Sequence, residues 1–247
     1  MKTGIQVSSL KPLLTTSDQV RSAFARMGRM GQPYLQLQWI DPSVPIPVIA
    51  ECMAENGQIS LGVQDFYEIV AENLAYYVNL NAATGGKYIT VSRIPEKWKS
   101  REGLACFALA LWELQASLPA GQELLLHPVS ADYRAVPGMN AVEYLLEKLP
   151  WLKLCLDLYH LDRCCDDMPG FLRKYRGRLV MVHFKDGIGD NLVPAGQGTV
   201  NWQGVVEACL ETGVGYGLAE QERWDGDPYV CLEQALEWLE RQMEIHK

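Results

Sequence analysis

Three of the four histidines in this 247-residue chain, His127, His160 and His183, end or follow short runs of apolar residues. Two acids have equivalent places, because Asp157 lies near the end of one apolar run and Glu220 directly follows another. Imidazole and carboxylate ligands without thiolates suit Mn²⁺, Mg²⁺, Co²⁺ or Zn²⁺, and such a cation polarises a carbonyl and an adjacent hydroxyl. If these runs are strands whose ends converge, the pattern predicts a divalent-metal site.

The stretch after Arg178 gives the clearest local pattern. Residues 179–182 are apolar without alternation, which is typical of a strand buried on both faces. The polar residues His183, Lys185 and Asp186 follow at its C-terminal end, where parallel α/β proteins bind their ligands. Lys185 and Asp186 could pair with each other, or Asp186 could orient the site while Lys185 holds an anionic oxygen.

These residues also have purely structural interpretations. Asp157 could cap the following turn, Glu220 could be a solvent-facing loop acid, and His183 could be a core histidine with satisfied hydrogen bonds. A Lys-Asp pair directly after His183 favours a site over a core. His127 and His160 leave both alternatives open.

Apolar runs and helical patterns alternate in a regular order along the chain. Eight such units in about 250 residues predict a single (β/α)8 barrel domain spanning 1–247. The first turn lacks the G-x-G-x-x-G pattern of an open nucleotide-binding sheet. The expected strands are 4–10, 34–40, 59–63, 88–91, 123–127, 152–158, the run from 179, and 215–219; the expected helices are 17–28, 45–53, 66–82, 103–117, 141–149, 169–175, 202–211 and 228–242. Residues 186–201 are expected to form a loop that covers the site.

Composition restricts the functional class. A net charge of −8 opposes non-specific binding of nucleic acid, which needs a basic surface. No apolar run is long enough to span a membrane, and the N-terminus lacks the features of a signal peptide. Seven scattered cysteines without a Cys-x-x-Cys pair indicate free thiols, so we expect a cytoplasmic protein. Self-association into a homo-oligomer is left open.

Several motifs, taken together and in order, resemble those of one protein family. The early ones are Gly4-Ile5-Gln6, Leu35-Gln36-Leu37-Gln38 and Leu156-Asp157-Leu158-Tyr159-His160. The more specific ones are His183-Phe184-Lys185-Asp186, Gly196-Gln197-Gly198-Thr199-Val200-Asn201-Trp202 and Glu220-Gln221-Glu222. From Gly4 to about Leu239, the chain resembles the sugar phosphate isomerases and epimerases of the xylose isomerase-like TIM barrel superfamily.

The resemblance implies a metal held by Asp157, His183, Glu220 and a fourth ligand from the fifth strand. That strand departs from the family pattern, which has further histidines or a glutamate there, whereas this chain reads Leu126-His127-Pro128. His127 is therefore the expected fourth metal ligand. Asp132 is the nearest acid that could stand in for the missing glutamate.

The resemblance also implies isomerisation or epimerisation through an enediolate, in which one base removes a proton beside a carbonyl and another returns it. Glu220 is the expected first base, Asp132 or Glu222 the second, and His160 a proton carrier. Gln6, Lys185 and Glu222 are expected to contact a carbohydrate substrate, which is a sugar, a keto-polyol or a phosphorylated relative.

Three other functions compete with this interpretation. The departure in the fifth strand favours a catalytically silent barrel that binds a sugar or a partner protein. A dehydratase relative is a further alternative. The DNA-repair endonucleases of the same superfamily hold a cluster of zinc ions with many histidines, and four histidines with a net charge of −8 fit that function poorly.

Overall fold

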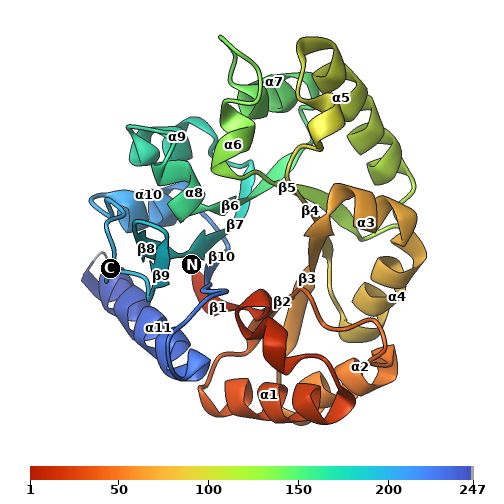
Figure 1. Ribbon diagram of the computed structural model, residues 1–247, viewed down its shortest axis with the longest axis vertical. Coiled ribbons are helices and arrows are strands. Elements are labelled where there is room, and N and C mark those ends of the chain that lie inside the picture. The colour runs from red at the N-terminus through yellow and green to blue at the C-terminus, as the bar shows by residue number, and fades with distance from the viewer. Residues whose placement is uncertain (246–247) are drawn as a thin grey trace.

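The structure is a computed structural model, and it describes residues 1–245. Eight parallel strands close into a barrel, and the helices surround it (Figure 1). The barrel strands are β1 (Lys2–Gln6), β2 (Tyr34–Leu37), β3 (Ile59–Phe66), β4 (Tyr88–Ser92), β5 (Glu123–His127), β6 (Lys153–Asp157), β7 (Leu179–Phe184) and β10 (Tyr216–Ala219). β1 pairs with both β2 and β10, which closes the ring. The predicted (β/α)8 barrel is confirmed.

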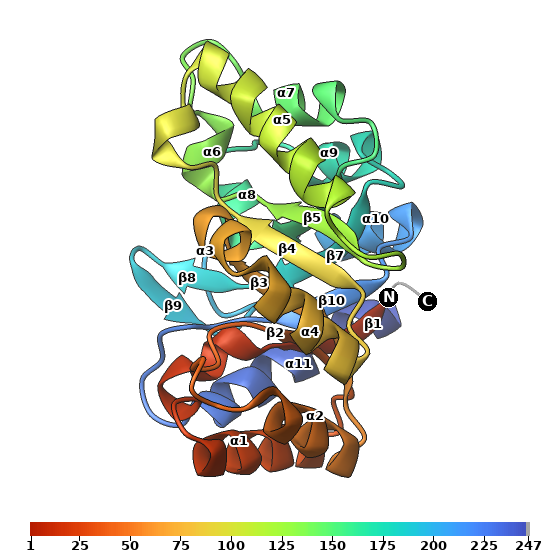
Figure 2. The ribbon, with the colours of Figure 1, turned by 90° about the vertical axis from the view of Figure 1, so that its right-hand side faces the viewer.

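The helices lie outside the barrel and pack their apolar faces on it (Figure 2). They are α1 (Ser17–Arg29), α2 (Ile46–Glu55), α3 (Tyr67–Glu72), α4 (Leu74–Thr84), α5 (Arg101–Ala116), α6 (Ser130–Tyr133), α7 (Ala141–Lys148), α8 (Leu158–Asp162), α9 (Met168–Lys174), α10 (Val205–Thr212) and α11 (Pro228–Ile245). No helix among residues 1–245 is long and apolar enough to cross a membrane.

The barrel interior is filled by apolar side chains from five of its strands, β3, β5, β6, β7 and β10. Leu61, Leu125, Cys155, Met181 and Leu218 form a buried cluster there, apart from the larger core between the strands and the helices. Such layered filling makes the barrel a packed core rather than a pore. Polar chemistry is therefore confined to the layers nearest the ends of the strands.

Several expected boundaries shift by a few residues, and the expected strand 34–40 ends at Leu37. Three expected elements differ in a way that bears on the site. The first strand ends at Gln6, because the chain then turns into the 3₁₀ helix η1 (Val7–Leu13) instead of staying extended to residue 10. The expected helix 66–82 is two helices, α3 and α4, which are separated at Asn73. The expected loop 186–201 contains the antiparallel hairpin of β8 (Asp186–Ile188) and β9 (Asn191–Val193).

Asp186 fixes the base of this hairpin and the segment that follows it. Its buried carboxylate accepts hydrogen bonds from the backbone N–H groups of Gly187, Gly196, Gly198 and Val200, at 2.8–3.1 Å. It also accepts a 2.9 Å bond from the indole Nε1 of Trp202. A Cβ at residue 198 would lie 2.0 Å from Asp186 Oδ1, so only glycine allows this approach. Of the two alternatives for Lys185 and Asp186, the direct pair is not formed, because Lys185 contacts Glu222 while the Asp186 carboxylate accepts backbone N–H bonds.

Asp186→Ala is expected to lower the free energy of unfolding by about 3–5 kcal/mol, because it leaves several buried donors without an acceptor. Thermal unfolding measures this change, and limited proteolysis should show faster cleavage within residues 187–201. Asp190→Ala is the matched control, since this exposed acid of the same segment makes no side-chain bond within residues 1–245. Equal melting temperatures for the two variants would contradict the role given to Asp186.

Candidate metal centre and active site

Four buried side chains meet where β5, β6, β7 and β10 end. His127 and Asp157 are the last residues of β5 and β6, His183 lies near the end of β7, and Glu220 follows β10. One ligand atom from each of the four lies within 4.8 Å of all the others. The structure thus brings together the residues that the sequence suggested as metal ligands, because parallel strands deliver their ends to one mouth.

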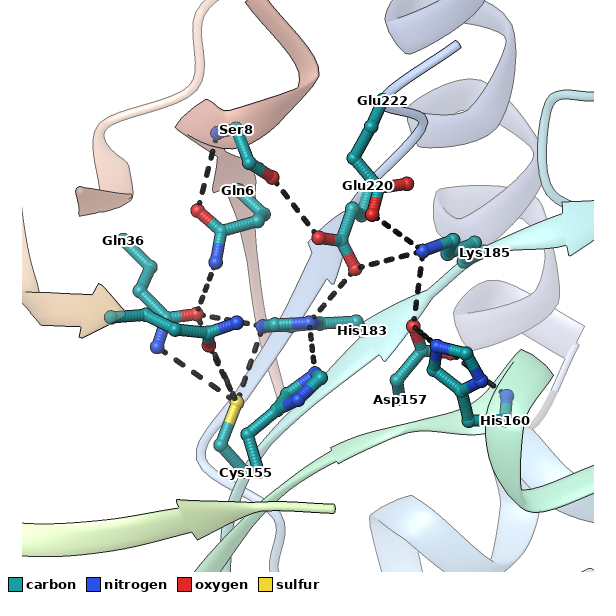
Figure 3. A network of polar contacts seen from close by, with 12 residues as sticks. Gln6, Ser8, Gln36, Cys155, Asp157, His160, His183, Lys185, Glu220 and Glu222 are labelled. Atoms are coloured by element: carbon teal, nitrogen blue, oxygen red, sulfur yellow. Dashed lines mark hydrogen bonds and ion pairs between the residues drawn. The ribbon is translucent and has the colours of Figure 1, made fainter. Parts of the chain in front are cut away.

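His183 is oriented by a partner on the far side of its ring. Its Nε2 lies 2.7 Å from Gln36 Oε1, and its Nδ1 lies 3.0 Å from Glu220 Oε2 (Figure 3). Because Gln36 Oε1 can only accept, Nε2 carries the proton and Nδ1 faces the cluster. This arrangement is typical of metal-binding histidines, whose second nitrogen is hydrogen-bonded to an oxygen.

His127 is oriented in the same manner by Ser92. Its Nδ1 lies 3.1 Å from Ser92 Oγ, and its Nε2 lies 3.2 Å from His183 Nδ1. Burial, together with the charge of His183, lowers the pKa of His127 to about 3, so this ring is neutral. A neutral imidazole whose Nε2 points at the cluster can serve as a ligand.

The donor set fits a divalent cation. Asp157 Oδ2 is buried and accepts no hydrogen bond within residues 1–245, although Lys185 Nζ lies 3.4 Å away, so this oxygen keeps lone pairs that a divalent cation could use. A cavity of about 40 Å³ lies at the cluster and is lined by His127, Asp157 and Glu220, among others. The two imidazoles and two carboxylates of the cluster match nitrogen and oxygen ligation of Mn²⁺, Co²⁺ or Zn²⁺.

Lys185 places an ammonium group among the acids of the site (Figure 3). Its Nζ lies 2.7 Å from Glu222 Oε1, 3.4 Å from Asp157 Oδ2 and 4.0 Å from Glu220 Oε2. Burial opposes the charge of Lys185, but these three carboxylates raise its pKa above the usual value. The ammonium therefore offsets part of the negative charge that the acids concentrate in the mouth.

The three acids titrate differently. Burial raises the pKa of each, but Lys185 and His183 hold the pKa of Glu220 well below its ordinary value. Lys185 and His160 likewise lower the pKa of Asp157. For Glu222, burial and the negative charge of Glu220 outweigh the effect of Lys185, so the pKa of Glu222 is raised. Glu220 is thus the carboxylate suited to accept a proton from substrate, and Glu222 the one suited to hold a proton.

Metal affinity should rise with pH in the neutral range. Burial alone would lower the pKa of His183, but Cys155 and Glu220 raise it well above its usual value, so the metal-free ring carries a proton on Nδ1. A cation must displace that proton, which weakens binding by about tenfold per pH unit below the raised pKa. Mn²⁺ titrations between about pH 6 and pH 8 measure this slope, and a flat profile would contradict a protonated His183.

Two other expected site residues, His160 and Gln6, lie at different depths in the site. His160 borders the mouth, with its Nε2 3.8 Å from Asp157 Oδ2, and its buried Nδ1 makes no hydrogen bond with any residue from 1 to 245. Gln6 is buried beneath the site, where its Nε2 donates to Gln36 Oε1 at 3.0 Å, so it supports the histidine partner rather than lining the cavity.

Asp132 lies outside the cluster and is tied into the backbone. Its Oδ2 accepts a 3.0 Å bond from Val129 N–H, and its Oδ1 lies 3.6 Å from Lys99 Nζ. Burial raises the pKa of Asp132, while the N–H groups of Val129 and Ile94 oppose that rise. The acid therefore holds together the turns after β4 and β5 and does not replace a glutamate ligand.

Several polar side chains of the site were not found from the sequence. Gln36 and Ser92 orient the two histidines, and Ser8 donates its hydroxyl to Glu220 Oε1 at 3.0 Å. Cys155 lies under His183, with its sulfur 3.2 Å from Nε2. The only available signal was a glutamine at position 36 between apolar neighbours in a buried strand.

The xylose isomerase-like TIM barrel family matches residues 17–242, so the chain belongs to this family. Among curated proteins, none matches the sequence significantly.

Solved structures with the same fold come from several bacteria. A sugar phosphate isomerase/epimerase from Parabacteroides distasonis has a TM-score of 0.78 at 15% identity, covering 96% of this chain and 97% of that one. D-allulose 3-epimerase from Methylomonas sp. in complex with D-allulose has a TM-score of 0.75 at 18% identity, with 98% and 96% covered. A family 2 AP endonuclease from Brucella melitensis has a TM-score of 0.71 at 16% identity, with 97% and 98% covered. At these identities the likeness establishes the fold.

Proposed function

We propose that this protein is a metal-dependent isomerase or epimerase of a sugar or keto-polyol. The observation that carries the proposal is the convergence of His127, Asp157, His183 and Glu220 at the C-terminal mouth of the barrel. Three of them, His127, Asp157 and Glu220, also line a small cavity there. Solved barrels that resemble this chain include a D-allulose 3-epimerase and an L-ribulose 3-epimerase. A divalent cation, when bound there, would polarise the substrate carbonyl and stabilise an enediolate.

Glu220 is the residue that we assign to proton abstraction. Its Oε1 is held by the Ser8 hydroxyl, and its Oε2 faces the mouth beside Lys185. The low pKa of this carboxylate keeps it ionised at neutral pH, which a base requires. Ser8 fixes the direction of the carboxylate, so that little reorganisation is needed when the substrate is in place.

Glu222 and His160 are the candidates for returning a proton. Both line the cavity that holds the metal cluster, and burial favours the protonated form of Glu222. The Lys185 ammonium donates a hydrogen bond to Glu222 at 2.7 Å, and it can also donate one to a substrate oxygen in the same cavity. If the proton is returned to the neighbouring carbon, the reaction is an isomerisation. If it is returned to the same carbon from the opposite face, the reaction is an epimerisation.

Proton-exchange NMR tests the proposal directly. In separate samples, the metal-free protein is loaded with Mg²⁺, Mn²⁺, Co²⁺ or Zn²⁺ and mixed with a panel of ketoses in D₂O. The recovered ketoses are then analysed for loss of the carbon-bound proton beside the carbonyl. Metal-dependent exchange of at least one ketose supports an isomerase or epimerase. Stoichiometric metal without exchange of any ketose would refute the enzymatic proposal, and ketose binding in that case would favour the silent sugar-binding barrel that the fifth strand suggested.

A further inference from the structure

Arg93 occupies a strained position at the rim of the mouth. It directly follows β4 and has a φ of 64°, and Trp39 is the only other non-glycine residue within 1–245 with a positive φ. Such a conformation costs on the order of 1–3 kcal/mol, and it tends to occur where a side chain is aimed at a ligand. The Arg93 N–H donates to His127 O at 3.1 Å, so the turn is fixed against the strand that supplies a candidate metal ligand.

The same residue borders two adjoining cavities. One is the cavity of about 40 Å³ at the metal cluster, and the other is a cavity of about 500 Å³ over the ends of β4 and β5. Phe66, Ser92, Val129 and His160 also border both, so the two cavities adjoin at this point. A substrate held at the cluster would extend past Arg93 into the larger space.

The guanidinium of Arg93 has no carboxylate partner within 4.0 Å among residues 1–245. The Cζ atom of Arg93 lies 4.8 Å from the centre of the Phe66 ring. This contact involves the flat face of the guanidinium, so the N–H donors at its edge stay available to a ligand. Lys99, the other cation of the larger cavity, already pairs with Glu96 and Asp132. Arg93 is thus the available donor of positive charge beside the site.

We propose that Arg93 determines specificity by binding an anionic group of the substrate, so that the substrate is a phosphorylated sugar or a sugar acid. The oxygens at the reacting carbons would lie at the metal cluster, and the anion would lie in the larger cavity against the guanidinium. A planar fork of N–H donors suits both carboxylate and phosphate oxygens. The inference deepens the proposed sugar isomerase function and rests on it for the position of the reacting carbons.

Equilibrium titration of the Zn²⁺-loaded protein tests this assignment without turnover. The probes are D-fructose, D-fructose 6-phosphate and D-fructuronate. Tighter binding of an anionic probe than of fructose, by about tenfold or more, is expected, because a charge-assisted bidentate contact is added. The probe that gains most distinguishes phosphate from carboxylate. Arg93→Gln should remove the gain and leave the affinity for fructose and Zn²⁺ unchanged, and Arg93→Lys should retain part of it.

Arg29→Gln is the matched control, since it removes one exposed arginine from α1, away from both cavities. The proposal is overturned if wild-type protein binds the three probes equally, or if Arg93→Gln keeps the preference for anions. An equal loss for all three probes would also overturn it, since that result indicates a role in shaping the mouth. Failure of ketose proton exchange would refute the proposed function alone, because these affinities do not depend on turnover.

Discussion

Glu220→Gln is expected to lower metal-dependent proton exchange by about 10³-fold or more and to weaken the metal site at the same time. A glutamine cannot accept the substrate proton, and general-base catalysis alone contributes about 10²–10⁴-fold. The amide also carries no charge to hold a cation, and it removes the carboxylate partner of His183 at 3.0 Å. The predicted signature is a joint loss of exchange rate and Mn²⁺ affinity.

Calorimetric Mn²⁺ titration and D₂O exchange at saturating metal separate these two losses. Glu207→Gln, which changes an exposed acid of α10, is the matched control and should alter neither quantity. Full exchange activity of Glu220→Gln at saturating metal would show that another group is the base. Unchanged Mn²⁺ affinity would remove Glu220 from the ligand set.

His127→Ala is expected to reduce metal affinity by tens-fold or more, because it would remove one of the four proposed protein ligands and leave water in its place. The alternative is that His127 only packs at the end of β5, and then its loss would lower stability by about 1–3 kcal/mol and leave the affinity intact. The geometry favours a ligand, since Ser92 holds Nδ1 and directs Nε2 toward His183 Nδ1 at 3.2 Å. Calorimetric Mn²⁺ titration decides between the two outcomes.

Two further variants sharpen this test. Ser92→Ala removes the hydroxyl that orients the ring and should cost about tenfold in metal affinity, as losses of outer partners do. His127→Glu restores a carboxylate at the fifth strand and should shift the preference toward Mg²⁺ and Mn²⁺, which favour oxygen ligands. Wild-type affinity in His127→Ala would exclude His127 from the site, whatever the other two variants show.

The sequence was sufficient to predict the barrel and the four residues that could hold a metal ion. The repetition of buried strands and amphipathic helices sets the fold, because only a closed parallel barrel buries eight such units in this length. Once the strands are placed, residues at their C-terminal ends must share one mouth, so His127, Asp157, His183 and Glu220 could be grouped without coordinates.

Contacts between side chains that are distant in sequence could not be read from the chain. The orientation of His183 depends on Gln36, which is 147 residues away, and that of Glu220 depends on Ser8, which is 212 residues away. Local patterns carry no information on which two interior side chains face each other across a barrel. The register of the strands and their twist decide those pairs.

The loops were decided almost entirely by tertiary structure. Asp132 looked like a replacement for a missing ligand from its distance along the chain, but the turn after β5 directs its carboxylate to Val129 N–H and Lys99. Residues 186–201 were expected to form a loop, but the segment contains the β8–β9 hairpin, and the Asp186 carboxylate accepts hydrogen bonds from the N–H groups of Gly196 and Gly198. The types and order of the residues were enough to predict the strand ends, because backbone geometry fixes where the last side chain of a strand lies. The positions of loop side chains depend instead on contact partners that only the folded chain brings close.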